Sequence, residues 1–180
     1  PYTPSHPDDE ELDLPAASPL VDNGKYYRRG LLMHRLLQFL PADADITKKD
    51  SLIDSFLQKN AADMPPKFHR QIKTEILRIL TDNKFKFIFG SGSRAEVPVM
   101  GEVDGRIVSA QIDRLVISKD KITVVDFKTN CPPAETTDKV PAAYKKQLAV
   151  YKQLIEKIYP GYPVETFILW TNSANLMKIA

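Results

Sequence analysis

The chain has 180 residues, of which 43% are apolar and 27% are charged, which fits one globular domain with an appended segment and argues against a two-domain enzyme. No stretch reaches the roughly 18 consecutive apolar residues of a membrane span, and no segment resembles a signal peptide, so we expect a soluble, intracellular protein. The single cysteine, Cys131, cannot form an internal disulfide bond and cannot alone ligate an iron–sulfur cluster.

The N-terminal segment differs from the rest of the chain in charge. Residues 1–22 hold six acidic side chains, no Lys or Arg, and five of the fourteen prolines, so residues 1–23 are predicted to form an acidic, extended linker. Without those six acids, 17 acidic residues remain against 25 basic ones, a net charge of +8 over residues 23–180. A basic domain favours a polyanionic partner such as nucleic acid, although about as many basic domains bind none.

The next part of the chain is predicted to be helical. Helices are expected over residues 25–40 and 49–59, and a third starts at Pro65-Pro66. Spacings of three and four residues put the following side chains on packed faces: Tyr27, Leu31, His34 and Leu37 in the first helix, and Phe68, Ile72, Ile76 and Ile79 in the third.

Strands follow. We predict them over residues 85–89, 95–101, 106–117 and 121–128, joined by Asp104-Gly105 and by a polar turn at 118–121, as an antiparallel meander. A helix over 141–159, a buried strand over 164–170 and a short apolar end at 176–179 complete the chain. The predicted class is α+β or mixed α/β, with a central mixed sheet flanked by helices.

The turn at 118–121 fixes a register. If Lys119 and Asp120 are its two central residues, Leu115 faces Val124 and Asp113 faces Asp126. Two opposed carboxylates on a face that is otherwise apolar destabilise a sheet unless one is protonated or a cation lies between them. Magnesium and manganese prefer oxygen ligands of this kind.

Period-two alternation returns Lys128 to the face of Asp126. Two metal-binding carboxylates beside one ammonium can activate water and stabilise a phosphate under attack. An exposed charge cluster on a solvated sheet face is the commoner origin of an Asp-x-Lys triplet, but the pairing with Asp113 favours the metal site.

Four further residues each allow two readings. Glu96 could add an oxygen ligand, although an acid at a strand end is more often solvated. His34 fits an interior imidazole on a packed helix face better than a ligand when taken alone. Gln147 and Tyr151 share a face of the last helix, where they fit phosphate or base contacts as well as a hydrogen-bonded helix–sheet interface.

Three ordered strings resemble the RecB-like branch of the PD-(D/E)XK nucleases: Gln111-Ile112-Asp113-Arg114-Leu115, Val125-Asp126-Phe127-Lys128-Thr129-Asn130, and Gln147-Leu148-Ala149-Val150-Tyr151. Residues 29–37 resemble the N-terminal helix of this branch with its metal-binding histidine. Two segments near the C-terminus, 158–161 and 168–171, are particularly similar to the AddA subunit of bacterial AddAB helicase–nucleases. The resemblance covers residues 24–180.

The resemblance implies a restriction-endonuclease-like fold and a Mg²⁺-dependent deoxyribonuclease, with Mn²⁺ as an alternative. It implies His34, Asp113, Asp126 and the carbonyl of Phe127 as metal ligands, Lys128 as the catalytic lysine, Gln147 and Tyr151 as completing residues and Glu96 as a supporting acid. One cysteine excludes the relatives that carry an iron–sulfur cluster.

The resemblance also implies partners. They are DNA, an AddB-like subunit and a helicase region N-terminal to this domain, all in the bacterial cytoplasm. The sequence has no phosphate loop, so ATP would bind only in that helicase region. The alternatives are a catalytically silent DNA-binding module of the same fold and a stand-alone RecB-like exonuclease.

Overall fold

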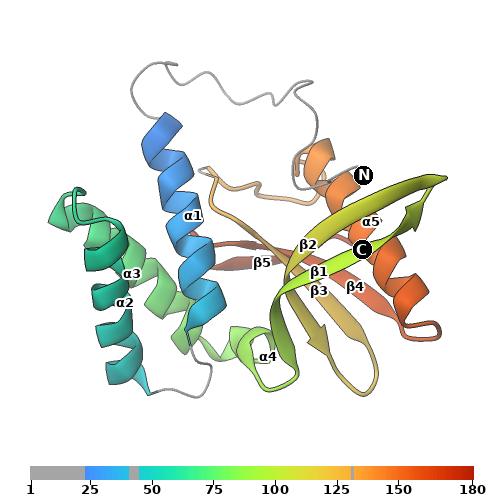
Figure 1. Cartoon of the computed structure of the whole chain (residues 1–180), viewed down its shortest axis with the longest axis horizontal. Helices are drawn as coiled ribbons and strands as arrows, with labels where there is room; N and C mark the ends of the chain where they lie inside the picture. The colour runs from blue at the N-terminus through green and yellow to red at the C-terminus, as the bar shows by residue number, and fades with distance from the viewer. Residues whose placement is uncertain (1–22, 41–44, 131) are drawn as a thin grey trace.

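The structure is a computed structural model that describes residues 23–40, 45–130 and 132–180. The predicted linker, except for Asn23, and Cys131 lie outside these residues. A five-stranded sheet with the order β1-β2-β3-β4-β5 forms the centre. Helices α1 to α4 pack on one face of this sheet and α5 packs on the other, as Figure 1 shows.

The three predicted N-terminal helices are present as α1 (Asn23–Phe39), α2 (Ile46–Asn60) and α3 (Pro66–Thr81). Asp45 begins α2, because its side chain accepts a hydrogen bond from the backbone N–H of Lys48 at 2.7 Å and so satisfies a free donor of the first turn. Proline at the first position of α3 has a backbone that suits a helix start and lacks only an N–H that would be unpaired there.

The predicted packed face of α1 is partly wrong. Tyr27 is 76% exposed and Leu31 is 42% exposed, whereas Leu37 is buried as expected. The helix contacts α2, α3 and the sheet together, so its buried side chains form a wider band that is rotated from the predicted one: Leu32, Met33, Leu36 and Leu37.

The strand predicted over 85–89 is also wrong. Residues Asn83–Phe85 form a 3-10 helix, labelled η1, and Lys86–Phe89 form the short helix α4. Phe85, Ile88 and Phe89 are buried while Phe87 is exposed, a spacing of three and four residues that a helix produces. A short apolar run is compatible with either structure, and packing against the other helices selects the helix here.

The predicted strands after this point are confirmed. β1 (Ser93–Val103), β2 (Arg106–Ile117) and β3 (Ile122–Lys128) form an antiparallel meander. Helix α5 (Ala142–Ile158) then crosses the sheet to β4 (Val164–Trp170), which runs parallel to β3, and β5 (Asn175–Lys178) pairs antiparallel with β4. The mixed sheet with flanking helices confirms the predicted fold class.

Each face of the sheet has its own core. The helical-side core joins α1 to α4 with Val125, Phe127 and Leu169. The α5-side core joins α5 with Val124, Ile168 and their neighbours. Since successive side chains of a strand point to opposite faces, β3 and β4 supply both cores at once. Within the described residues, no helix combines the length and apolar character needed to span a membrane.

Candidate active site

The β1–β2 pairing is interrupted at one position. Ala95 pairs with Arg114 and Val97 pairs with Ile112, so Glu96 and Asp113 lie opposite each other, but they do not form a register pair. Glu96 has φ of 49°, in the left-handed region that side chains other than glycine rarely adopt. Such a conformation costs on the order of 1–3 kcal/mol and concentrates at functional sites.

The interruption changes which face the side chains of β2 occupy. Ile112 and Leu115 both belong to the α5-side core, although three positions separate them. Arg114 lies on the helical side, where its guanidinium donates to the carbonyl of Leu37 and lies 4.9 Å from the centre of the Phe89 ring. The regular alternation therefore shifts by one residue at Asp113.

The predicted β2–β3 register is confirmed up to the site. Leu115 pairs with Val124 and the ladder ends at Arg114 and Val125, one step before the expected pair of Asp113 and Asp126. Oδ2 of Asp113 instead accepts the backbone N–H of Phe127 at 2.6 Å. The two carboxylates thus have separate partners rather than forming a bare pair of like charges.

Helix α1 supplies His34 to this position. Its Nδ1 lies 3.4 Å from Oδ1 of Asp113, and its ring meets the edge of the Phe127 ring with centres 5.7 Å apart. One turn earlier, a Cβ at Gly30 would lie 3.0 Å from Oγ1 of Thr129. The missing side chain at residue 30 therefore allows α1 to approach the end of β3, which brings His34 to Asp113.

Asp126 and Lys128 form a buried ion pair on the other side of β3. Lys128 Nζ lies 2.8 Å from Oδ2 of Asp126, and Asp126 is only 4% exposed. Burial raises the pKa of Asp126, and the charge of Asp113 raises it further against the opposing effect of Lys128. Burial lowers the pKa of Lys128, but the charge of Asp126 outweighs this and raises it, so the ammonium stays protonated at neutral pH.

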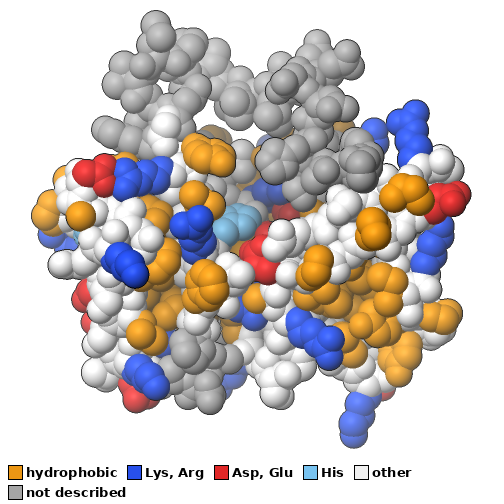
Figure 2. Space-filling model, viewed as in Figure 1, with side chains coloured by type: hydrophobic (Ala, Val, Ile, Leu, Met, Phe, Trp, Pro, Cys, Tyr) orange, Lys and Arg blue, Asp and Glu red, His pale blue; other side chains and the backbone are white. Residues whose placement is uncertain are grey.

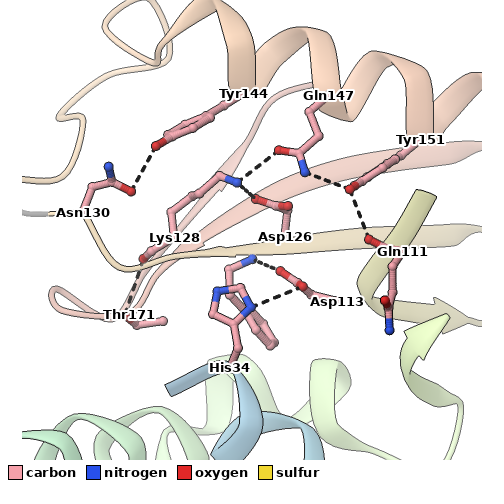
Figure 3. Close-up of polar contacts among 11 residues, drawn as sticks. His34, Gln111, Asp113, Asp126, Lys128, Asn130, Tyr144, Gln147, Tyr151 and Thr171 are labelled. Carbon is pink, nitrogen blue, oxygen red and sulfur yellow. Dashed lines mark hydrogen bonds and ion pairs between the residues drawn. The ribbon is translucent and has the colours of Figure 1, made fainter. Parts of the chain in front are cut away.

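Helix α5 holds Lys128 through a chain of hydrogen bonds, drawn in Figure 3. Lys128 Nζ donates to Oε1 of Gln147 at 3.1 Å, and Nε2 of Gln147 donates to the Tyr151 hydroxyl at 2.8 Å. That hydroxyl donates to the carbonyl of Gln111 at 3.1 Å. Gln147 and Tyr151 were predicted as site residues, whereas Tyr144 was not. The centre of the Tyr144 ring lies 4.3 Å from Lys128 Nζ.

His34 and Glu96 respond to their surroundings in the same direction. Burial lowers the pKa of His34, but the hydrogen bond and the charge of Asp113 outweigh it and the net shift is upward. Burial raises the pKa of Glu96, and the charge of Asp113 adds to this effect. Both pKa values are thus raised, and the charge of Asp113 contributes to each shift. A cation bound beside Asp113 would oppose that contribution.

A cavity of about 240 Å³ collects these side chains. Figure 2 shows a histidine and acidic side chains meeting in the hollow between the helical part of the molecule and the sheet. The following residues line the cavity: His34, Glu96, Gln111, Asp113, Asp126, Lys128, Gln147 and Tyr151. All side chains that the sequence analysis singled out therefore meet in one place.

Three of these side chains could hold a metal ion. One ligand atom each from His34, Glu96 and Asp113 lies within 4.8 Å of the other two. The two carboxylates are donors that suit Mg²⁺ or Mn²⁺, and the imidazole is a nitrogen donor that Mn²⁺ accepts more readily than Mg²⁺. Asp126 lines the same cavity, but its carboxylate pairs with Lys128. The third side chain grouped with His34 and Asp113 is therefore Glu96 and not Asp126.

A sequence signal for Glu96 existed. Asp104 and Gly105 form the two-residue turn between β1 and β2, and Val103 pairs with Arg106 across it. Counting back from that pair puts Glu96 directly opposite Asp113, by the same arithmetic that connects Asp113 with Asp126. The predicted pairing of Asp113 with Asp126 rests on the second turn alone, so it does not include Glu96.

The chain is similar to known proteins at the level of a superfamily. No curated protein gives a significant match. A crystal structure of a protein called SSO0001 aligns with 76% of this chain and 78% of its own, at 12% identity and a TM-score of 0.36. The sequence profile of the PD-(D/E)XK nuclease superfamily matches residues 10–175. Members of this superfamily are generally metal-dependent nucleases. The chain therefore belongs to the PD-(D/E)XK nuclease superfamily.

Proposed function

We propose that this domain is a divalent-metal-dependent deoxyribonuclease that hydrolyses phosphodiester bonds, with His34, Glu96, Asp113 and Lys128 as its central residues. The observation that supports this most is that three side chains able to hold a metal ion and a half-buried, charged lysine line one cavity. Superfamily membership supports the same reaction class.

The residues of the chain have distinct tasks in this proposal. His34, Glu96 and Asp113 would hold Mg²⁺ or Mn²⁺, with Asp126 and the Phe127 carbonyl as the further ligands implied by the resemblance. A bound ion supplies an electrophile for a phosphate oxygen and lowers the pKa of water. Lys128 stabilises negative charge on the phosphate, while Gln147 and Tyr151 fix the direction of its ammonium.

The cellular role is the finer part of the proposal. The order of the three motifs supports a domain that degrades a strand delivered by a helicase, as in the AddA subunit of AddAB during processing of double-strand breaks. The net charge of +8 over residues 23–180 supports contact with DNA. An AddB-like subunit and an N-terminal motor region that binds ATP would be the partners.

The test is cleavage of end-labelled single- and double-stranded DNA with Mg²⁺, with Mn²⁺ and with EDTA. We expect metal-dependent cleavage that EDTA abolishes and that Lys128→Ala reduces at least a hundredfold, because the ammonium stabilises the transition state. Lys119→Ala is the matched control, since Lys119 lies exposed in the turn at the far end of the same hairpin. Full cleavage by Asp126→Ala or Lys128→Ala contradicts the assignment.

A folded protein that binds DNA but never cleaves it would support the silent DNA-binding module instead. The remaining alternative is a stand-alone RecB-like exonuclease. Any sequence upstream of Pro1 distinguishes it from a helicase-linked nuclease, because only the latter predicts a phosphate loop there.

The metal ligands need a readout other than cleavage. Titration with Mn²⁺, followed by calorimetry or by electron paramagnetic resonance, measures binding of the ion directly. Glu96→Gln is expected to weaken binding by tenfold or more. Glu102→Gln is the matched control on the same strand, because Glu102 is exposed outside the cavity, and equal binding by both variants would remove Glu96 from the ligand set.

A further inference from the structure

A second hollow lies on the far side of α3 from the helical-side core. It has a volume of about 370 Å³ and is formed by the exposed face of α3 together with the turn after β4. Its lining consists of Glu75 and the following residues: Lys67, Arg70, Gln71, Thr74, Arg78 and Asn172. None of these belongs to the cavity of the candidate active site, and we call this hollow the α3 groove.

The α3 groove holds cations that lack a counter-charge. Within the described parts of the chain, no carboxylate lies within ion-pair distance of Lys67, Arg70 or Arg78, and all three are exposed. The one acid in the lining, Glu75, is already neutralised by an ion pair with Arg29 of α1. The groove therefore has an uncompensated charge of about +3, which attracts a polyanion.

The neighbouring face of the same helix shows the opposite arrangement. Lys73 Nζ lies 2.8 Å from Asp50 and 2.7 Å from Asp54, both on α2. Where α3 meets another helix, its lysine is thus paired twice, while the cations of the groove have no such partner. The unpaired charge is therefore confined to the face that is open to a ligand.

Three groove residues lie in a row along α3, an arrangement that suits a linear ligand. Arg70, Thr74 and Arg78 recur every four residues, so they line up along about 12 Å of helix. This length is enough to contact a few successive phosphates of a DNA strand. No aromatic side chain is among the described residues of the lining, so bases have no platform for stacking and the ligand is recognised by its backbone.

A short chain of contacts joins the α3 groove to the active site. Asn172 Nδ2 donates to the carbonyl of Asn130 at 3.2 Å, and Oδ1 of Asn130 accepts from the Tyr144 hydroxyl at 3.1 Å. The ring of Tyr144 lies against the ammonium of Lys128, as Figure 3 shows. Asn172 of the groove thus lies beside Asn130, two residues after Lys128.

We propose that the α3 groove binds the phosphodiester backbone of DNA outside the cleavage site, through Lys67, Arg70 and Arg78. This binding surface holds the DNA strand in line with Lys128 and does not distinguish between base sequences. The proposal rests on the proposed function for its ligand, but its own test is independent of cleavage.

The test measures affinity for a fluorescent oligothymidylate of about 20 nucleotides, by anisotropy in EDTA, over a series of salt concentrations. The triple variant Lys67→Gln, Arg70→Gln, Arg78→Gln is compared with Lys86→Gln, Arg106→Gln, Lys119→Gln, which removes three exposed charges elsewhere. Loss of three phosphate contacts makes the slope of log affinity against log salt less negative by about 2, and it lowers affinity roughly tenfold to a hundredfold. A parallel series on a duplex of equal length shows which form of DNA uses the groove.

Two outcomes overturn the proposal: equal loss of affinity in the two triple variants, and an unchanged salt slope in the groove variant. The double variant Lys67→Gln, Arg70→Gln keeps the contact between Arg78 and the carbonyl of Asn172, and it should change the slope by about 1.4 even if the triple variant folds poorly. A protein that cleaves no DNA but binds through the groove refutes the nuclease function alone. A protein that cleaves DNA while its groove variant binds like the control refutes the groove alone.

Discussion

The two sides of the sheet are built from the same strands but differ in what they contain. The helical-side core packs apolar side chains, such as Ile53 and Phe127, around the buried guanidinium of Arg114, which donates to a backbone carbonyl. The α5-side core encloses polar groups, with Gln147 and Thr166 among its buried residues. On β3, Val125 and Phe127 face the first core while Val124 and Asp126 face the second. Packing on one face thus fixes the strand, so that the other face can hold charged groups in a defined position.

The largest expected effect tests whether the helical-side core is purely structural. Ile53 is fully buried in α2, so Ile53→Ala should lower the free energy of unfolding by about 2–5 kcal/mol through lost burial and a residual cavity. Urea denaturation followed by circular dichroism measures this. Leu52→Ala, at a neighbouring exposed position, should cost less than about 1 kcal/mol. Cleavage per folded molecule should not change, and a loss beyond the unfolded fraction would contradict the separation of the two sides.

An intermediate effect is expected from the polar chain on the α5 side. Tyr151→Phe removes the hydroxyl that bonds Gln147 and the carbonyl of Gln111, so the unfolding free energy should fall by about 1–2 kcal/mol. Cleavage should fall between tenfold and a hundredfold, because Gln147 no longer fixes Lys128. Tyr159→Phe, which removes a hydroxyl without a bond in the described residues, should change neither quantity. Loss of stability with full activity would mean that these hydrogen bonds stabilise the packing of α5 but do not position Lys128 for cleavage.

The smallest effect compares two buried hydroxyl groups, one within β4 and one directly after it. The hydroxyl of Thr166 is buried and has no hydrogen-bond partner in the described residues, so Thr166→Val should raise the unfolding free energy by roughly 1 kcal/mol. Thr171 is equally buried, but its hydroxyl donates to the carbonyl of Lys128 at 3.4 Å, so Thr171→Val should lower stability. Melting temperatures that shift in the same direction for both variants would show that the hydrogen bond does not account for the difference between the two threonines.

Much of the sheet side of the molecule could be predicted because its turns are local. The turn at Lys119 and Asp120 fixes the pairing of Leu115 with Val124, and alternation from there puts Asp126 and Lys128 on one face. The end of β4 follows from the apolar run Phe167-Ile168-Leu169-Trp170, which stops at the polar Thr171-Asn172-Ser173, as expected of a parallel strand buried on both faces. Turn chemistry and periodicity thus sufficed for these elements.

The rest depended on contacts between distant parts of the chain. Whether Phe85 to Phe89 forms a strand or a helix is decided by packing, not by the run itself. The face that α1 buries depends on α2 and α3, so Tyr27 was assigned to the wrong side. The place of Glu96 beside His34 depends on a left-handed backbone angle and on the approach of α1 at Gly30, neither of which has a periodic signature.

The missing register pair between Glu96 and Asp113 has a mechanical consequence. Strands of 11 and 12 residues form here two paired stretches, one on each side of a position without a register pair. The two facing acids thus lie at a break in a ladder that is paired on both sides. A change of backbone angle at Glu96 would therefore alter the separation between its carboxylate and that of Asp113 with little effect on either stretch, and the metal ion proposed for this site would act on that separation.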